Sequence, residues 1–172
     1  QYDLATASWA NRETAQYWNQ DGFLRVLTQE QDGWFFAFKQ SKNPFSISIY
    51  QESPTDVKMF VNHQQTNGLG LAGLAKSIDD MQAMLQKFQI EKTGFVFVVD
   101  KHGLIKLHKD ASKVAKAKLD TLYESGITST LLTDEEFTLK EVSIKGEETL
   151  VAASPIKNTD LFVVAQVPKR EV

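Results

Sequence analysis

Hydrophobic and polar residues alternate over several short runs, the pattern typical of β-strands that bury one face. Residues 45–51 and 57–64 alternate in this way, and the apolar, glycine-rich residues 69–76 follow. In the first run Ser46, Ser48 and Tyr50 share one side. Three later runs repeat the plan, over residues 137–144, 149–156 and 161–167. The pattern predicts two three-stranded meanders of nearly equal length, residues 45–76 and 137–169.

A hairpin is predicted between the two meanders. Gly94 opens the apolar run 95–99, a turn follows at Asp100–Gly103, and residues 104–108 alternate. Asp at the first turn position bonds its own backbone, and Gly at the fourth tolerates positive φ. Because the first strand is apolar throughout, we expect both of its faces to be buried.

Helical spacing predicts three helices. Residues 5–19 place Ala5, Trp9, Ala15 and Trp18 on one broad apolar face. Residues 77–88 begin with a Ser77–Asp80 capping box and carry an apolar stripe, so they predict a linking helix. Asp110 begins a third helix that runs through residue 123 and ends at Gly126.

Composition narrows the classes of function. The chain has 172 residues, a net charge of −3 and a pI near 5.6, so it carries no basic footprint for nucleic acid. It contains no cysteine, which excludes disulfides and thiolate metal sites. No apolar run reaches the ~20 residues needed to span a bilayer. Because the chain opens at Gln1, we expect a longer protein. Pro168 suits a first helical turn, so we also expect a helix to continue just past Val172.

Four segments together resemble the later part of a double Cache domain, the PAS-like extracytoplasmic sensor of bacterial receptors. They are residues 9–15, 22–27, 32–36 and 93–108. Relatives of this kind are chemotaxis receptors, sensor histidine kinases and membrane diguanylate cyclases. The resemblance implies an α+β fold of tandem PAS-like units, each an antiparallel sheet backed by helices.

The resemblance also implies an organisation. Residues 1–88 would form a membrane-distal unit that includes the linking helix 77–88, and residues 89–172 a membrane-proximal unit. The first unit shows no obvious entry hairpin, so we expect it to be incomplete. The implied protein is the periplasmic part of an inner-membrane receptor, flanked by membrane helices and homodimeric. It would have no catalytic activity and no cofactor.

The aromatic run 34–38 is the best candidate for a pocket, because aromatic walls with a few polar groups are typical of small-molecule sites. Arg25 and Lys39 could hold a carboxylate or phosphate. Tyr50 and Asn62 could point from the sheet into the same space. The predicted ligand-binding set is Arg25, Trp34, Phe36, Lys39, Tyr50 and Asn62. Alternatively, the aromatic residues are core and the cations are solvated.

Cache sensors that bind amino acids carry the motif Arg-x-Trp-Tyr-x-x-Ala. Here Trp34 and Phe35 match the aromatic pair, but Asp32 stands at the Arg position and Phe38 at the Ala position. The resemblance therefore implies a sensor of a small polar metabolite without indicating an α-amino acid.

Other chemistry finds no supporting pattern. His63, His102 and His108 lack metal-ligand spacing. Asp79 and Asp80 lie in a first helical turn, where the helix dipole favours anions. The letters G-x-G-x-x-G at residues 68–73 follow a turn rather than a strand, which argues against a dinucleotide site. Two alternatives stay open: a module that docks a periplasmic binding protein, and a cytosolic enzyme fragment or cofactor-bearing PAS domain.

Overall fold

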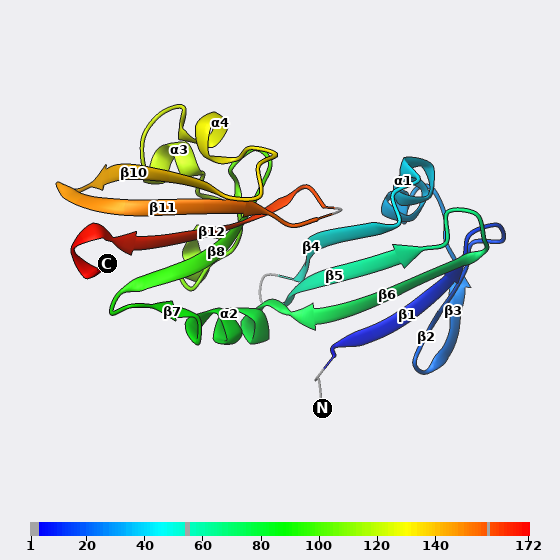
Figure 1. The fold of residues 1–172 in the computed structure, drawn as a ribbon. Coiled ribbons are helices and arrows are strands. Elements are labelled where there is room, and N and C mark those ends of the chain that lie inside the picture. The colour runs from blue at the N-terminus through cyan, green and yellow to red at the C-terminus, as the bar shows by residue number, and fades with distance from the viewer. Residues whose placement is uncertain (1–3, 54–55, 158) are drawn as a thin grey trace. The chain divides into compact units, whose positions relative to one another are not determined.

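The computed structural model describes residues 4–53, 56–157 and 159–172. The chain divides into two compact units, Gln1–Ile78 (unit 1) and Asp79–Val172 (unit 2), each built on its own antiparallel sheet (Figure 1). The boundary lies ten residues before the expected one at 88/89.

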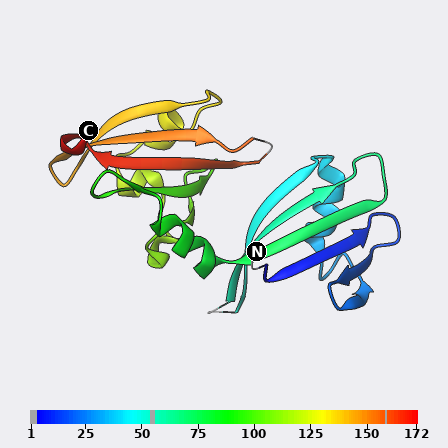
Figure 2. The same cartoon turned by 60° about the horizontal axis from the view of Figure 1, so that its bottom comes forward.

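Unit 1 is a six-stranded sheet in the order β3-β2-β1-β6-β5-β4, with one helix against one face (Figure 2). Its elements are β1 (Thr6–Asn11), β2 (Gln16–Asn19), β3 (Gly22–Val26), α1 (Gly33–Ser41), β4 (Phe45–Ser53), β5 (Asp56–Gln64) and β6 (Gly70–Ser77). The aromatic run 34–38 forms α1, and its buried Phe35 and Phe38 pack on Ala10, Leu27 and Leu71. The predicted meander β4–β5–β6 is confirmed.

The predicted helix over residues 5–19 is wrong. This segment forms the antiparallel hairpin β1–β2, in which Trp9 pairs with Trp18. The Asn11 side chain closes the turn, because its Oδ1 accepts hydrogen bonds from the backbone N–H groups of Glu13 and Thr14, both at 2.9 Å. Apolar residues that fit one helical face also fit this pairing. Unit 1 therefore has an entry hairpin, contrary to prediction.

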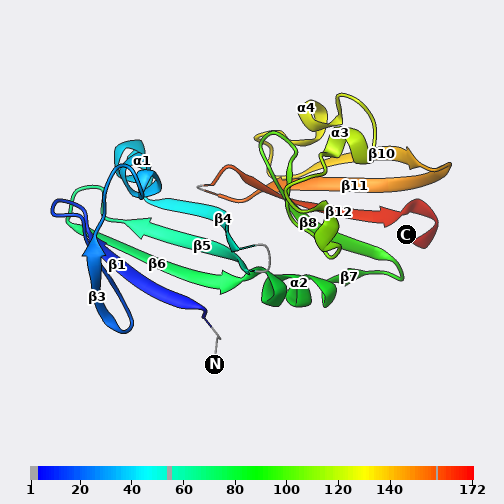
Figure 3. The same cartoon turned by 180° about the vertical axis from the view of Figure 1, so that it is seen from behind.

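Unit 2 holds the second sheet, whose main path is β10-β11-β12-β8-β7, with β9 paired to β8. Its strands are β7 (Gln89–Ile90), β8 (Gly94–Asp100), β9 (Ile105–Leu107), β10 (Thr138–Ile144), β11 (Glu147–Pro155) and β12 (Leu161–Pro168). Its helical elements are α2 (Ile78–Gln86, beginning at the boundary), η1 (Ala111–Lys113), α3 (Leu119–Leu122), α4 (Ile127–Leu131) and η2 (Lys169–Glu171). Figure 3 shows α3 and α4 against one face of this sheet.

The central hairpin, the second meander and the helix near residues 77–88 are confirmed. The Asp100 Oδ1 atom accepts hydrogen bonds from the backbone N–H groups of His102 (2.9 Å) and Leu104 (3.0 Å), as the turn chemistry predicts. In β8, Phe97 and Val99 are fully buried, and the other predicted strand residues are half-buried.

The predicted single helix from Asp110 to residue 123 is wrong. Asp110 does cap a helical turn, because its side chain accepts from Ser112 N–H at 3.0 Å. The turn stops after three residues because Ala115 takes a positive φ of 58° and donates its N–H to the Ile105 carbonyl at 2.8 Å. Gly126, at φ 86°, precedes α4 instead of ending a long helix.

The two units share one plan of entry hairpin, covering helices and meander. In unit 1 the hairpin strand β1 pairs with the last meander strand β6, and in unit 2 β8 pairs with β12. Ser8 and Phe97 each lie three residues before the turn residue, Asn11 or Asp100, that caps its hairpin. The hairpin turns thus align the two sheets position by position.

Candidate ligand-binding site

A row of small polar residues crosses the helix-covered face of the unit 1 sheet. Ser8 pairs with Gly73, Gly73 with Asn62, and Asn62 with Ser46, so the row spans β1, β6, β5 and β4. We call these four residues the polar row. Ser8 and Asn62 are buried, and the Asn62 Nδ2 atom lies 3.4 Å from the Ser46 Oγ atom. Strand alternation places the row on the same face as Ala10 and Leu71, which pack under α1.

The equivalent positions in unit 2 are apolar or nearly so. Phe97 pairs with Val164, Val164 with Ala153, and Ala153 with Thr138. Phe97 and Val164 have no exposed surface, and Ala153 is 3% exposed. One scaffold therefore carries a packed hydrophobic row in unit 2 and a polar row in unit 1.

Gly73 leaves room for the side chains of its neighbours in the polar row. A Cβ atom at this position would lie 2.5 Å from the Asn62 Oδ1 atom and 3.1 Å from the Ser8 Oγ atom. Contacts this short force neighbouring groups to move, so any larger residue would displace the Asn62 carboxamide. Gly73 is itself buried, and its lack of a side chain leaves room for the side chains of Asn62 and Ser8.

Buried polar contacts fix α1 to the sheet next to the row. The Gln64 side chain is 1% exposed, and its Nε2 group donates to the carbonyls of Phe38 (2.7 Å) and Asn43 (2.8 Å). Arg12 Nε donates in turn to Gln64 Oε1 at 3.0 Å. Because a buried carboxamide is costly to leave unpaired, these bonds hold the end of α1 in place.

Arg25 and Asp32 fix the other end of α1. The guanidinium NH1 and NH2 groups donate to the two carboxylate oxygens at 2.5 and 2.6 Å, and Thr28 N–H donates to the same carboxylate at 3.0 Å. The hydrogen bond from Arg25 lowers the pKa of the Asp32 carboxyl, and the same bond raises the pKa of Arg25. Asp32 is buried, so the bidentate pair anchors the loop that enters α1.

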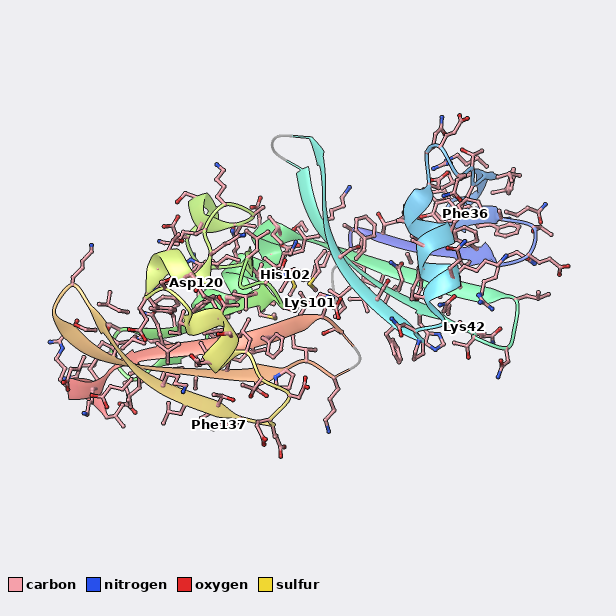
Figure 4. The ribbon with its side chains drawn as sticks, turned by 90° about the horizontal axis from the view of Figure 1, so that it is seen from above. Phe36, Lys42, Lys101, His102, Asp120 and Phe137 are labelled. Atoms are coloured by element: carbon pink, nitrogen blue, oxygen red, sulfur yellow. The ribbon has the colours of Figure 1, made fainter. Side chains whose placement is uncertain are left out.

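The predicted site residues separate into groups. Trp34 and Phe36 lie on α1, on which Phe36 is labelled in Figure 4. Trp34 is 43% exposed and edge-on to Tyr17, with the ring centroids 6.5 Å apart. Lys39 is half-buried on the same helix. Asn62 belongs to the polar row.

Two predicted residues stand apart from that grouping. Arg25 is engaged by Asp32. The Tyr50 backbone in β4 pairs with Lys58 in β5, and the structure does not describe the Tyr50 side chain.

Ser8, Gly73 and Gln64 were not identified from the sequence. Ser46 was visible as part of the polar side of one alternating run, but its partners lie on strands that are distant in sequence. The glycine-rich residues 68–73 drew attention to Gly73, but they did not indicate that it lies between Ser8 and Asn62.

Solved structures resemble the whole chain at low sequence identity. No family model matches the sequence. The ligand-binding domain of the Pseudomonas fluorescens chemoreceptor CtaA, solved with L-isoleucine, superposes with a TM-score of 0.68 at 17% identity, covering 97% of this chain and 70% of that one. The chain has the fold of a Cache-type sensor domain.

Two further matches agree with this Cache-type fold. The ligand-binding domain of the Pseudomonas aeruginosa chemoreceptor PctB, solved with L-arginine, gives a TM-score of 0.64 at 18% identity, covering 98% and 68% of the two chains. The extracellular domain of the histidine kinase mmHK1S-Z2 gives 0.68 at 13% identity, covering 98% and 76%. The predicted α+β arrangement of tandem PAS-like units is thereby confirmed. Within the described residues, no helix has the length and hydrophobicity to cross a membrane.

Proposed function

We propose that this chain is the extracytoplasmic sensing region of a bacterial transmembrane receptor of the chemotaxis type, and that unit 1 binds a small polar metabolite. The polar row carries the proposal. At the positions that unit 2 fills with Phe97, Val164 and Ala153, unit 1 keeps hydroxyl, carboxamide and glycine groups. Chemoreceptor domains of the same fold hold L-isoleucine and L-arginine, which supports a ligand in this fold.

The chemistry of the row selects the ligand. Its side chains are neutral, and the Asn62 carboxamide offers both donors and an acceptor. The part of the ligand that faces the sheet is therefore a hydroxyl, carbonyl or amide group. Trp34 and Phe36 on α1 supply the apolar wall, and Lys39, the one basic residue within α1, supplies a cation for an acidic end. Arg25 acts as a positioning residue through Asp32.

We extend the proposal to the whole receptor. Unit 1 is membrane-distal and unit 2 membrane-proximal in a homodimeric receptor whose membrane helices lie outside this chain, and the domain itself uses no cofactor and performs no catalysis. The terminal segment η2 is fastened to unit 2 by Lys169, which meets Glu141 at 2.6 Å. Ligand binding shifts the equilibrium between two packings of the meander against this terminal segment.

A thermal-shift screen against a metabolite library tests the proposal, because a ligand that binds only the folded state raises its stability. A confirmed hit is then titrated by calorimetry against three variants. Trp34→Ala and Ser46→Ala are expected to weaken binding by about tenfold each, equivalent to about 1.4 kcal/mol. Phe137→Ala, which removes a 63% exposed aromatic in unit 2, is the matched control and leaves the affinity unchanged.

Two results would contradict the proposal. One is a hit whose affinity is the same in the wild type and in both unit 1 variants. The other is a hit that the Phe137→Ala control weakens as much as Trp34→Ala does.

A further inference from the structure

Unit 2 contains a groove that the polar row does not explain. Its volume is about 320 Å³, and it lies among the last turn of α2, the β7–β8 turn, the start of β8 and Lys109, the second residue after β9. Its main lining residues are Leu85, Gln86, Phe88, Lys92, Phe95 and Lys109. All belong to unit 2, so the groove is a feature of one folded body.

One side of the groove is apolar and poorly covered. Phe88 is 55% exposed at the end of α2, beside the buried Leu85. Gly94 also lines the groove, and a Cβ atom there would lie 2.7 Å from the Ile90 carbonyl oxygen and 2.8 Å from that of Gln166. A side chain at this position would therefore clash with the backbone. An exposed phenylalanine beside a concave surface favours an apolar occupant.

The rim of the groove is positively charged. The Lys109 Nζ atom stands 3.8 Å from the centre of the Phe95 ring. Within the described ranges 4–53, 56–157 and 159–172, neither Lys109 nor Lys92 forms an ion pair. The neighbouring carboxylate of Asp110 is taken by Lys113 at 2.6 Å. An ammonium group over an aromatic face keeps its charge available to an anion.

The adjoining turn already holds a carboxylate. Glu171 Oε2 accepts from the backbone N–H groups of Lys92 (3.1 Å) and Thr93 (2.9 Å), and its Oε1 accepts from the Thr93 hydroxyl at 2.7 Å. These donors are used by the protein itself. An anion in the groove must therefore be bound by the lysine side chains, and the Lys109 ammonium over the Phe95 ring is the candidate donor.

We propose that this groove is a second ligand site, which takes a small carboxylic acid with an apolar body. The carboxylate binds the Lys109 ammonium, and the apolar body lies against Phe88 and Leu85. The site is independent of the polar row in unit 1. The chain thus carries two sites of different chemistry, neutral and polar in one unit and anionic and apolar in the other.

Titration with hexanoate, followed by ¹H–¹⁵N NMR of the whole chain, tests the site. Saturable shifts at the amides of Thr93, Gly94 and Lys109 are expected, with hexanamide producing none because it lacks the charge. Lys109→Gln is expected to weaken hexanoate binding by about fivefold or more, and Phe88→Ala to weaken it by a similar factor. Lys116→Gln, at an exposed lysine of the same unit outside the groove, leaves binding unchanged.

Shifts that do not saturate at millimolar hexanoate would overturn the proposal, as would equal binding of hexanamide or an unchanged affinity in Lys109→Gln. Trp34→Ala separates the two sites. This variant is expected to weaken binding of the unit 1 metabolite and to leave hexanoate binding unchanged. Failure of one proposed site therefore does not decide the other.

Discussion

Units 1 and 2 place opposite chemistry on equivalent positions of two separate sheets that share one strand plan. In the unit 2 row Phe97–Val164–Ala153–Thr138, the first three residues pack into one core with Ile105 and Leu119, and Thr138 is half-buried at the end of the row. The row Ser8–Gly73–Asn62–Ser46 in unit 1 forgoes that packing, and the smaller core under α1 lies to one side of it. Hydrophobic burial is the main stabilising term in folding, so we expect unit 2 to be the more stable unit, and we propose that unit 1 gives up this packing for ligand binding.

The largest effect is expected from Phe97→Ala. Truncating a fully buried phenylalanine typically lowers the free energy of unfolding by about 3–5 kcal/mol, whereas Ser8→Ala at the equivalent position in unit 1 is expected to change it by about 1 kcal/mol or less. All three tryptophans (Trp9, Trp18 and Trp34) lie in unit 1. In urea, Phe97→Ala should therefore shift the circular dichroism transition and leave the tryptophan fluorescence transition in place. Coincident shifts of both transitions would show that the units do not differ as described.

The second effect is a pH dependence confined to unit 2. His108 is 3% exposed, lies between Phe95 and Phe97, and accepts a hydrogen bond at Nδ1 from Asp110 N–H at 2.8 Å. Burial, assisted by Lys113 and Lys109 and opposed by Asp110, lowers the pKa of His108 from 6.5 to about 4. Between these values the unfolded chain binds a proton that the folded chain does not. Unit 2 therefore loses stability as the pH falls from 6.5 toward 4, by at most about 1.4 kcal/mol per pH unit.

Urea titrations between pH 7 and pH 4 measure this loss. In His108→Leu the slope over that range should flatten, because the titrating group is gone. His102→Gln, in the exposed β8–β9 turn, is the control and keeps the wild-type slope. An identical pH profile in His108→Leu would assign the acid sensitivity to other groups.

The third effect is expected from Gly73→Val, which introduces the residue type that unit 2 has at the equivalent position, Val164. Gly73→Val places a side chain where even a Cβ atom lies 2.5 Å from Asn62 Oδ1, so Asn62 must shift and ligand binding should be lost. Overpacking of this kind costs about 1–3 kcal/mol. Gly33→Ala is the matched control, because a Cβ atom there has no neighbour within 4 Å. Calorimetry with the unit 1 ligand reads the outcome, and wild-type affinity in Gly73→Val would remove the row from the site.

The smallest effect concerns the terminal segment. Glu171→Gln weakens the acceptor for the Lys92 and Thr93 amides, so their hydrogen exchange should accelerate while the melting temperature stays nearly constant. Arg170→Gln, which removes the ion pair with Glu147, is the neighbouring control and leaves those two amides protected. Equal protection in the wild type and Glu171→Gln would mean that the carboxylate does not fasten this turn.

The sequence predicts those parts of the fold in which local pattern and final structure agree. The meanders alternate strictly, and the Asp100 turn uses side-chain chemistry that is readable within four residues. The N-terminal hairpin was missed because Ala5, Trp9, Ala15 and Trp18 satisfy a helical face as well as a strand pairing. The helix after Asp110 was overextended because the bond between Ala115 N–H and the Ile105 carbonyl is a tertiary contact.

The candidate site was harder to predict than the fold. Trp34 and Phe36 come from the aromatic run 34–38 and Lys39 directly follows it, so all three lie on α1, and their role in binding stays a prediction. The polar row depends on the register of four strands, because Ser8 is joined to Ser46 through Gly73 and Asn62. No local pattern contains that register.

The most direct test of the account is an amide NMR map of the chain with the unit 1 metabolite identified by screening. The account predicts that the Gly73 backbone amide and the Asn62 side-chain amide shift on binding, while the equivalent Val164 and Ala153 amides in unit 2 do not. Shifts centred on Val164 and Ala153, with Gly73 and Asn62 unmoved, would contradict it.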